Sequence, residues 1–564
     1  MAISTTRPWK SAVQQKRTAQ LNAIPPSWRL PPATLTPPLP NTLETIRTCG
    51  ILSAQELEWT GANDVTNLLS LLASREVSSV QLTTAFCKRA AIAQQMIKCL
   101  TEIFFDRALA RAKELDDQYE KTGVLTGPLH GLPVSIKDRF DVEGIDTTVG
   151  WVGLIGKPAQ RSSSIARLLE SMGAVLYVKT NIPQSLMMSD SYNHVFGQSI
   201  NAFNHELISG GSSGGEGALI GTGGSILGIG TDIGGSIRIP AALQGLYSIC
   251  PTTGRVPWDC SFMHQHYLVP PVAGPMARSI ATIEYFMQSL LDSNPWDIDP
   301  GCVPIPWRKE LAALPDRKLK LGVFFDDGVV RPQPPITRAL REVVAKLAAA
   351  GHEVIEWSTS LHATGTDLWT KAILADGGSH CKHLCDIVDE PLIEGMVVGT
   401  AADELSMLER EKVAQRRQLI QKPQSPEADT SQLEEEKWLF QERFLKQWKD
   451  SGIDALLMPV TPWVGYKPKT WVKSAQWLGY TALWNLLNYA AVTVPVTSAD
   501  PALDQPDQDW LAYTPRNQSD EFNHGQYDID LVKNMPICVQ IVGGRFGEEK
   551  AVAVAKVLDE LVHS

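Results

Sequence analysis

Short apolar runs separated by amphipathic stretches are the dominant pattern of this chain from about residue 130 to its end. Seven of these runs have the length and composition of buried strands: 132–136, 174–179, 321–325, 353–357, 455–459, 491–496 and 537–542. Helical stretches lie between them, among them residues 163–172, 335–350 and 547–562. Buried strands that alternate with helices predict an α/β fold in which helices cover both faces of a sheet.

The first part of the chain has a different pattern. Residues 25–40 hold seven prolines, which predicts an extended, polyproline-type arm on the surface. The tetrapeptide Ser78-Ser79-Val80-Gln81 is a capping-box pattern and predicts a helix that runs from there towards Leu100. Residues 101–120 predict another helix.

The pattern predicts two units. No linker interrupts the strand runs, so all of these runs belong to one of the two units. Residues 1–75 form the Pro-rich arm with its helices, and residues 76–564 form a single large domain. Residues 403–450 break the alternation because they are polar, charge-rich and helical. We interpret them as a helical insertion on the rim, with Glu434-Glu435-Glu436-Lys437 on its solvated face.

Composition narrows the function classes. A hydrophobic content of 43% and a charged content of 20% are typical of a globular protein in water. The net charge of −11, without any basic block, argues against nucleic acid as a partner and leaves small neutral substrates open. No membrane span is expected, because uninterrupted apolar runs of 18 residues are missing. Nine scattered cysteines and a start without an apolar signal segment favour a cytoplasmic protein with reduced thiols.

Candidate chemistry gathers in residues 211–236, where two serine clusters stand among glycines. The first, Gly211-Ser212-Ser213-Gly214-Gly215, matches the G-x-S-x-G pattern of α/β-hydrolases. That pattern requires a strand before it and a suitably placed histidine after it, and neither is evident. A phosphate-binding loop is also disfavoured, because neither G-x-G-x-x-G nor Gly-Lys-Ser/Thr occurs in the stretch.

A serine nucleophile with a lysine base is the third interpretation. Lys137 follows the apolar run 132–136, and the carboxyl end of a strand is where α/β active sites form. Burial would lower the pKa of this lysine and leave its amine neutral. Ser236 ends a run of four backbone amides, Ile233 to Ser236, in a Gly-Gly turn that is suited to holding an oxyanion.

Both serine clusters resemble those of the amidase signature family: Gly-Gly-Ser-Ser-Gly-Gly-Glu-Gly-Ala at 210–218 and Gly-Thr-Asp-Ile-Gly-Gly-Ser-Ile-Arg-Ile-Pro at 230–240. The segment 129–138, Leu-His-Gly-Leu-Pro-Val-Ser-Ile-Lys-Asp, resembles the family's lysine segment. Segments 85–95 and 177–184 are similar to fungal acetamidases and general amidases in particular. The resemblance covers about residues 45 to 560 and implies the amidase-signature fold, a large, twisted, mixed central sheet covered by helices on both faces.

The resemblance also implies roles for individual residues. Ser236 matches the nucleophile, Ser212 the bridging serine that follows a cis peptide bond, and Lys137 the general base. The implied substrate-binding set comprises Ser212 and the oxyanion residues Ile233, Gly234, Gly235 and Ser236. Ser213, Thr231, Asp232 and Arg238 are expected to hydrogen-bond around the triad, and Arg238 to pair with Asp232.

Some other side chains are candidates for metal ligands or for the walls of a substrate pocket. Cys381 and Cys385 stand four residues apart on a predicted helix, but no second Cys/His pair follows them, so no metal site is predicted. The pair His264 and His266 is interpreted as part of a loop. Trp151, Met187, Met188 and Trp369 are candidates for the walls of an acyl or amine pocket, although such residues more often belong to the core.

The resulting hypothesis is an amidase without cofactor or metal that hydrolyses a small or arylalkyl primary amide. The first alternative is an enzyme similar to fatty acid amide hydrolases, with fatty acid amides as substrates. The second, which is not an enzyme, is a catalytically silent binding protein with the same fold. A transamidating subunit is disfavoured because it would need partner subunits. The expected partner is a small-molecule amide, with no nucleic acid and no membrane span, and a homodimer is left open.

Overall fold

One large sheet organises the molecule. The computed structural model describes residues 8–259, 268–313, 316–375, 378–393, 430–470 and 477–563. Within them an 11-stranded sheet has the order β1-β3-β2-β6-β8-β7-β12-β13-β11-β9-β10. Its strands are β1 Leu100–Ile103, β2 Pro133–Lys137, β3 Val175–Thr180, β6 Leu227–Asp232, β7 Tyr247–Cys250, β8 Val272–Ala277, β9 Lys320–Val323, β10 Glu353–Glu356, β11 Ala455–Pro459, β12 Ala490–Ser498 and β13 Pro536–Gly544. A separate two-stranded ribbon joins β4 Tyr192–Asn193 to β5 Gly197–Gln198.

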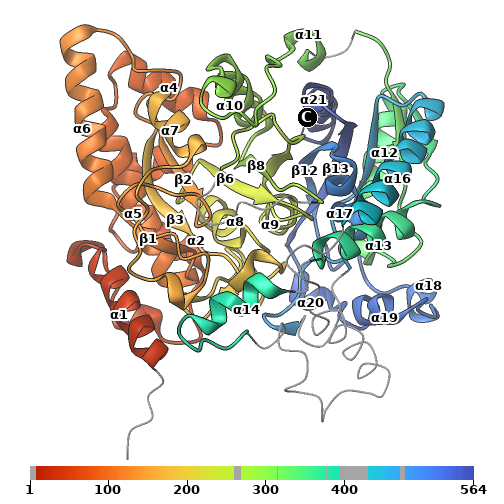
Figure 1. Cartoon of the computed structure of the whole chain (residues 1–564), viewed down its shortest axis with the longest axis horizontal. Coiled ribbons are helices and arrows are strands. Elements are labelled where there is room, and N and C mark those ends of the chain that lie inside the picture. The colour runs from red at the N-terminus through yellow and green to blue at the C-terminus, as the bar shows by residue number, and fades with distance from the viewer. Residues whose placement is uncertain are drawn as a thin grey trace, which may run out of the picture.

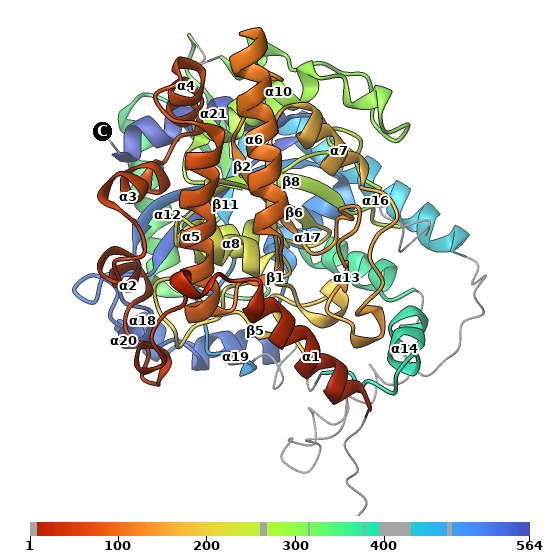
Figure 2. The same cartoon turned by 90° about the vertical axis from the view of Figure 1, so that its left-hand side faces the viewer.

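Helices lie on both faces of this sheet (Figures 1 and 2). They are α1 Pro8–Asn22, α2 Thr42–Thr48, α3 Ala54–Gly61, α4 Val65–Ser74, α5 Ser79–Ile97, α6 Phe105–Thr122, α7 Ser164–Ser171, α8 Gly214–Gly221, α9 Arg238–Leu243, α10 Ile280–Asp292, α11 Lys309–Ala312, α12 Pro334–Ala349, α13 His362–Ile373, α14 Ser379–Asp386, α16 Ser431–Ser451, α17 Gly479–Leu487, α18 Gln508–Leu511, α19 Gln518–Gly525, α20 Ile529–Val532 and α21 Glu548–His563. In the described residues, no helix is both long and apolar enough to cross a membrane.

Strand pairing is mixed, as the resemblance implied. β2 runs parallel to both β3 and β6, and β9 runs parallel to both β10 and β11, whereas the other pairs are antiparallel. All seven predicted strand runs are strands, with bounds that differ by at most two residues. The predicted α/β fold is therefore confirmed.

Four strands of the large sheet escaped prediction. β6 and β8 contain glycine or proline, which weaken the strand signal in a sequence. β7 is only four residues long. β1 falls at the start of the stretch predicted as one helix over 101–120, and that prediction is wrong there because residues 100–103 pair with β3 before α6 begins.

The N-terminal region differs in part from the prediction of an extended arm. Two short 3-10 turns, η1 Pro26–Trp28 and η2 Pro32–Leu35, interrupt the proline-rich stretch, each with proline at its start. The predicted helix at Ser78 is confirmed, and Ser78 and Gln81 form the capping box of α5. The division of the chain at residue 75 stays a prediction.

The predicted helical insertion is described only in part. Residues 403–429 lie outside the described residues, as do His264 and His266. Residues 431–451 form α16, which exposes Glu434, Glu435 and Glu436 and buries Phe440 and Phe444. The helical character of this part is thus confirmed, and its status as an insertion stays a prediction.

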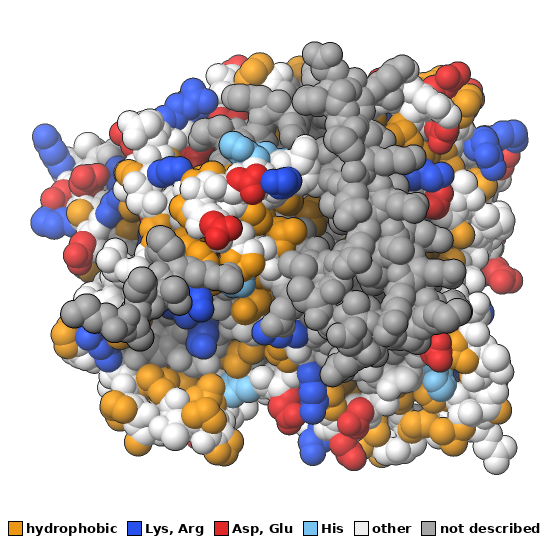
Figure 3. All heavy atoms as spheres, turned by 60° about the horizontal axis from the view of Figure 1, so that its bottom comes forward, with side chains coloured by type: hydrophobic (Ala, Val, Ile, Leu, Met, Phe, Trp, Pro, Cys, Tyr) orange, Lys and Arg blue, Asp and Glu red, His pale blue; other side chains and the backbone are white. Residues whose placement is uncertain are grey.

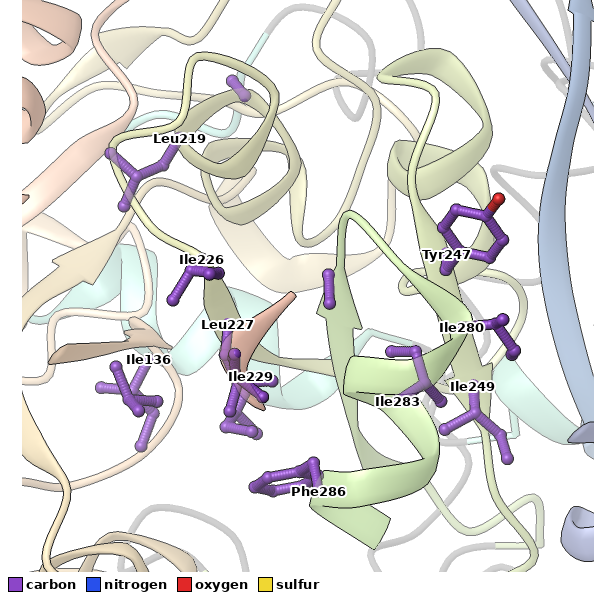
Figure 4. Close-up of a cluster of buried hydrophobic side chains, with 14 of the residues drawn as sticks. Ile136, Leu219, Ile226, Leu227, Ile229, Tyr247, Ile249, Ile280, Ile283 and Phe286 are labelled. Atoms are coloured by element: carbon purple, nitrogen blue, oxygen red, sulfur yellow. The ribbon is translucent and has the colours of Figure 1, made fainter. Parts of the chain in front are cut away.

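Buried aliphatic and aromatic side chains pack beneath β2 and β6. Figure 4 shows Ile136, Leu227 and Ile229 pointing into a layer that α10 closes with Ile283 and Phe286. All five side chains are fully buried.

On the face that lies at the bottom in Figure 1, described side chains of both charges are scattered among hydrophobic ones (Figure 3).

Candidate active site

Strands β2 and β6 bring the candidate residues to one edge of the sheet. They are parallel neighbours, with Ser135 opposite Gly228 and Ile136 opposite Ile229. Their carboxyl ends therefore meet at the same edge, which is the usual position of α/β active sites. Lys137 is the last residue of β2 and Asp232 is the last residue of β6.

Lys137 is fully buried and contacts hydroxyl groups. Its Nζ lies 2.8 Å from Ser212 Oγ and 2.7 Å from Thr231 Oγ1. Burial lowers the pKa of Lys137 well below its ordinary value, and Arg139 adds to the effect, while the negative charges of Asp232 and Glu216 oppose it. The lowered pKa favours the neutral amine, whose lone pair can accept a proton from Ser212.

Ser212 is held in place by a tightly packed backbone. The peptide bond between Gly211 and Ser212 is cis, as the resemblance implied. A side chain at Gly211 would meet Met188, because a Cβ there would lie 2.5 Å from that residue's carbonyl oxygen. Ser212 itself is only 2% exposed. Its hydroxyl is thus fixed over the lysine amine.

Ser236 lies in the turn that follows β6 and is half-buried. Its carbonyl accepts a hydrogen bond from Ser213 N at 3.1 Å, which ties the two serine clusters together. Within the described residues, the Ser236 hydroxyl makes no hydrogen bond, and the N–H groups of Ile233, Gly234 and Ser236 donate none. These groups are available to a ligand.

One of the four predicted oxyanion donors already has a partner in the structure. The Gly235 N–H already donates to Asp232 Oδ1 at 2.7 Å. A charged acceptor at this distance holds a backbone amide strongly. The Gly235 N–H is thus engaged, whereas the N–H groups of Ile233, Gly234 and Ser236 donate no hydrogen bond within the described residues.

A buried ion pair supports the turn. Arg238 donates to Asp232 through Nε at 3.1 Å and Nη2 at 2.9 Å, and both side chains are fully buried. The expected pairing of these residues is thus present. Burial alone would raise the pKa of Asp232, but the Arg238 guanidinium and the hydrogen bonds from Ile237 and Asn485 hold it well below its usual range.

The other two predicted neighbours also lie at the site. Thr231 receives the hydrogen bond from Lys137, and its backbone N–H donates to Ser213 Oγ at 3.2 Å. Lys137, Ser212, Ser213, Thr231, Asp232, Ser236 and Arg238 are therefore brought together by the fold, although they come from three separate parts of the sequence.

The similarity of this chain to known proteins identifies its family. The model of the family described as Amidase matches residues 81–552. An acetamidase of Emericella nidulans is 35% identical over 98% of this chain and 98% of its own length. The chain belongs to the amidase family. It is accordingly a hydrolase that acts on amides.

Other relatives and solved structures agree with this assignment. A putative amidase of Schizosaccharomyces pombe is 36% identical over 91% of each chain. A solved fatty acid amide hydrolase superposes with a TM-score of 0.89 at 30% identity, covering 99% of this chain and 96% of its own. A bacterial aryl acylamidase, with a TM-score of 0.68 at 20% identity over 88% of this chain and 96% of its own, shows the same fold.

Sequence reasoning missed several supporting residues of this amidase. Glu216 is fully buried on the first turn of α8, where it accepts hydrogen bonds from Ser135 and Thr180, and burial raises its pKa to about 7. Its position inside the Gly-Ser motif was the signal that could have found it. Thr481 and Asn485 lie more than 240 residues beyond the motif, and no local pattern marks them.

The pocket candidates have different surroundings. Trp369 lies at the turn, since its Nε1 donates to the Ile233 carbonyl at 2.8 Å. Trp151 is buried in an apolar cluster against Leu384. Met188 is buried, whereas Met187 is 39% exposed. Among the described residues, no group of three or more His, Cys, Asp or Glu side chains is arranged to hold a metal ion.

Replacing Asp232 tests the support of the turn. We expect Asp232→Asn to lower stability by about 3–5 kcal/mol, because it leaves the Arg238 charge buried without its partner. It should also abolish most amidase activity, because two amides of the turn lose a charged acceptor. Thermal unfolding and hydrolysis rates measure the two effects.

Asp117→Asn is the matched control, because it breaks an exposed ion pair with Lys113 by the same chemical change. It should leave the unfolding temperature and the activity unchanged. Equal stability of the Asp232 and Asp117 variants would contradict the role assigned to the buried pair.

Proposed function

We propose that this amidase hydrolyses a carboxylic acid amide to the acid and ammonia or an amine through Ser236, Ser212 and Lys137, by way of an acyl-enzyme. The observation that carries the proposal is the buried Lys137 amine, 2.8 Å from Ser212 Oγ. A lysine in this environment can act as a base near neutral pH, which a solvated lysine cannot do.

Acylation uses the three residues as a proton relay. Lys137 takes the proton of the Ser212 hydroxyl, and Ser212 takes the proton of Ser236 while Ser236 Oγ forms a bond to the amide carbonyl carbon. The carbonyl oxygen becomes an oxyanion. The N–H groups of Ile233, Gly234 and Ser236, which donate no hydrogen bond within the described residues, are the donors available to stabilise it.

Collapse of this intermediate breaks the C–N bond. The departing nitrogen needs a proton to leave as an amine, and it receives one from Ser212, which is resupplied by the Lys137 ammonium. A water molecule then attacks the acyl-enzyme, and its proton passes through the same relay. The Ser236 hydroxyl is restored when the acid departs, so no proton is gained or lost by the residues over one cycle.

For the substrate, we propose a small or arylalkyl primary amide. Relatives that are similar over nearly their full length include an acetamidase at 35% identity. A fatty acid amide is the second candidate, favoured by the fatty acid amide hydrolase structure that superposes with a TM-score of 0.89.

Covalent labelling tests the nucleophile. A fluorophosphonate probe reacts with activated serines, so the folded enzyme should be labelled at Ser236, as peptide mass spectrometry would report. Ser236→Ala should lose the label, whereas Ser70→Ala, at an exposed helical serine, should keep it. A fully labelled Ser236→Ala variant would exclude Ser236 as the nucleophile.

The pH profile tests the base. Because only neutral Lys137 accepts a proton, kcat/KM should fall as the pH is lowered through the depressed pKa of this residue and stay high at neutral pH. Lys137→Ala should reduce kcat/KM at pH 7 by about 10²- to 10⁴-fold. The exposed-lysine variant Lys113→Ala should retain the wild-type profile, and unchanged activity in Lys137→Ala would refute the assignment.

A panel of amides tests the substrate class. We expect the highest kcat/KM for acetamide-like or arylalkyl primary amides, with a decline as an unbranched acyl chain lengthens. Initial rates of ammonia release over acyl chains of increasing length measure this trend. A steady rise of kcat/KM towards long chains would favour the fatty acid amide alternative instead.

A further inference from the structure

Two side chains from the second half of the chain hold the carbonyl groups of the turn Ile233–Ser236 from outside. Trp369 Nε1 donates to the Ile233 carbonyl at 2.8 Å, and Thr481 Oγ1 donates to the Gly234 carbonyl at 2.6 Å. Neither residue belongs to the proposed triad. Each comes from an element far away in sequence, since Trp369 lies on α13 and Thr481 on α17.

These contacts act on the N–H groups through the peptide planes. A carbonyl and the N–H of the following residue share one rigid plane, so fixing the oxygen fixes the direction of that N–H. The Ile233 carbonyl shares its plane with the Gly234 N–H, which is one of the free donors. A hydrogen bond accepted at the oxygen also polarises the N–H at the other end of the same peptide group.

The next peptide plane is held at both ends. Thr481 binds its carbonyl at Gly234, and Asp232 accepts from its N–H at Gly235. This plane therefore cannot rotate, and it braces the preceding plane that carries the Gly234 N–H. The two side chains thus bind carbonyl oxygens of the turn, and the Asp232 carboxylate binds one of its N–H groups.

Close packing supports the same arrangement. A Cβ at Gly234 would lie 2.5 Å from Trp369 Cζ2, and Gly235 has a φ of 125° with Thr481 directly beside it. Helices α13 and α17 pack against each other, and Trp369 and Thr481 are both buried. The donors thus stand on a rigid aromatic support rather than on a loose loop.

We infer that Trp369 and Thr481 are positioning residues of the oxyanion site, which aim and polarise the Gly234 N–H at the charge that develops in the transition state. This inference rests on the proposed function. It adds a contribution to the site from the second half of the chain, which the Gly-Ser motif does not contain.

The test removes the indole N–H and keeps an aromatic ring. Trp369→Phe should lower kcat by about 10- to 100-fold, somewhat less than the loss of a direct oxyanion donor, because the backbone N–H itself remains. KM should change by no more than about threefold, since the donor acts on the transition state. The affinity for a trifluoromethyl ketone, which forms an oxyanion on a serine, should fall in parallel with kcat/KM.

Trp484→Phe is the matched control. The Trp484 Nε1 donates to the Tyr480 carbonyl at 2.9 Å within the same aromatic cluster and not to the turn. Its replacement should lower the unfolding temperature and leave kcat within about twofold of the wild type. Thr481→Val should reproduce the loss of kcat, and Thr481→Ser, which keeps the hydroxyl, should restore it.

The outcomes separate the two claims. A wild-type enzyme that is active and labelled at Ser236, with Trp369→Phe and Thr481→Val at wild-type kcat, overturns this inference and leaves the proposed function standing. The same result follows if the whole loss appears in KM, or if Trp484→Phe loses as much kcat as Trp369→Phe. A wild-type enzyme that is neither active nor labelled overturns both claims.

Discussion

The buried carboxylate of Asp232 is the interaction on which the geometry of the site depends. It ends strand β6 and accepts hydrogen bonds from the backbone of Gly235 and Ile237 and from the side chains of Arg238 and Asn485. Burying an ion costs several kcal/mol, which these donors offset only when all of them are in place. Hydrogen bonds to this charge therefore fix the conformation of the turn, whereas a sheet or a helix is held by hydrogen bonds between its own backbone groups.

Lys137, at the end of the neighbouring strand, has surroundings of the opposite kind, because no ion pair within the described part of the chain holds its charged form. It is as deeply buried as Asp232, but its nearest partners are the hydroxyls of Ser212 and Thr231. The carboxylate beside it in sequence, Asp138, is bound 2.8 Å away by Lys179 in another buried pair. At one sheet edge the surroundings thus lower the pKa of a carboxyl group and of an amine, which favours the ionised form of Asp232 and the neutral form of Lys137.

Local signals carried much of the fold and of the proposed site. The seven strand runs and the capping box at Ser78 were predictable because burial and capping leave their marks within a few residues. Lys137, Ser212 and Ser236 could be proposed because the motifs around them resemble those of the amidase signature family. The bound Gly235 amide could not be foreseen, since it depends on which side chain the turn encloses. Trp369 and Thr481 could not be found either, because only the packing of distant helices brings them to the turn.

The glycines of the motif show why the site is built on packed elements rather than on a flexible loop. Gly228 and Gly230 lie in strand β6, where a Cβ would collide with Glu216 and approach Ser213 Oγ to 2.9 Å. Helix α8 can therefore lie directly against β6, and this contact places Ser212 over Lys137. A site fixed so firmly has little freedom to adapt its catalytic groups to different amides. If the proposed proton relay and oxyanion donors are correct, substrate choice must then arise in the surrounding segments.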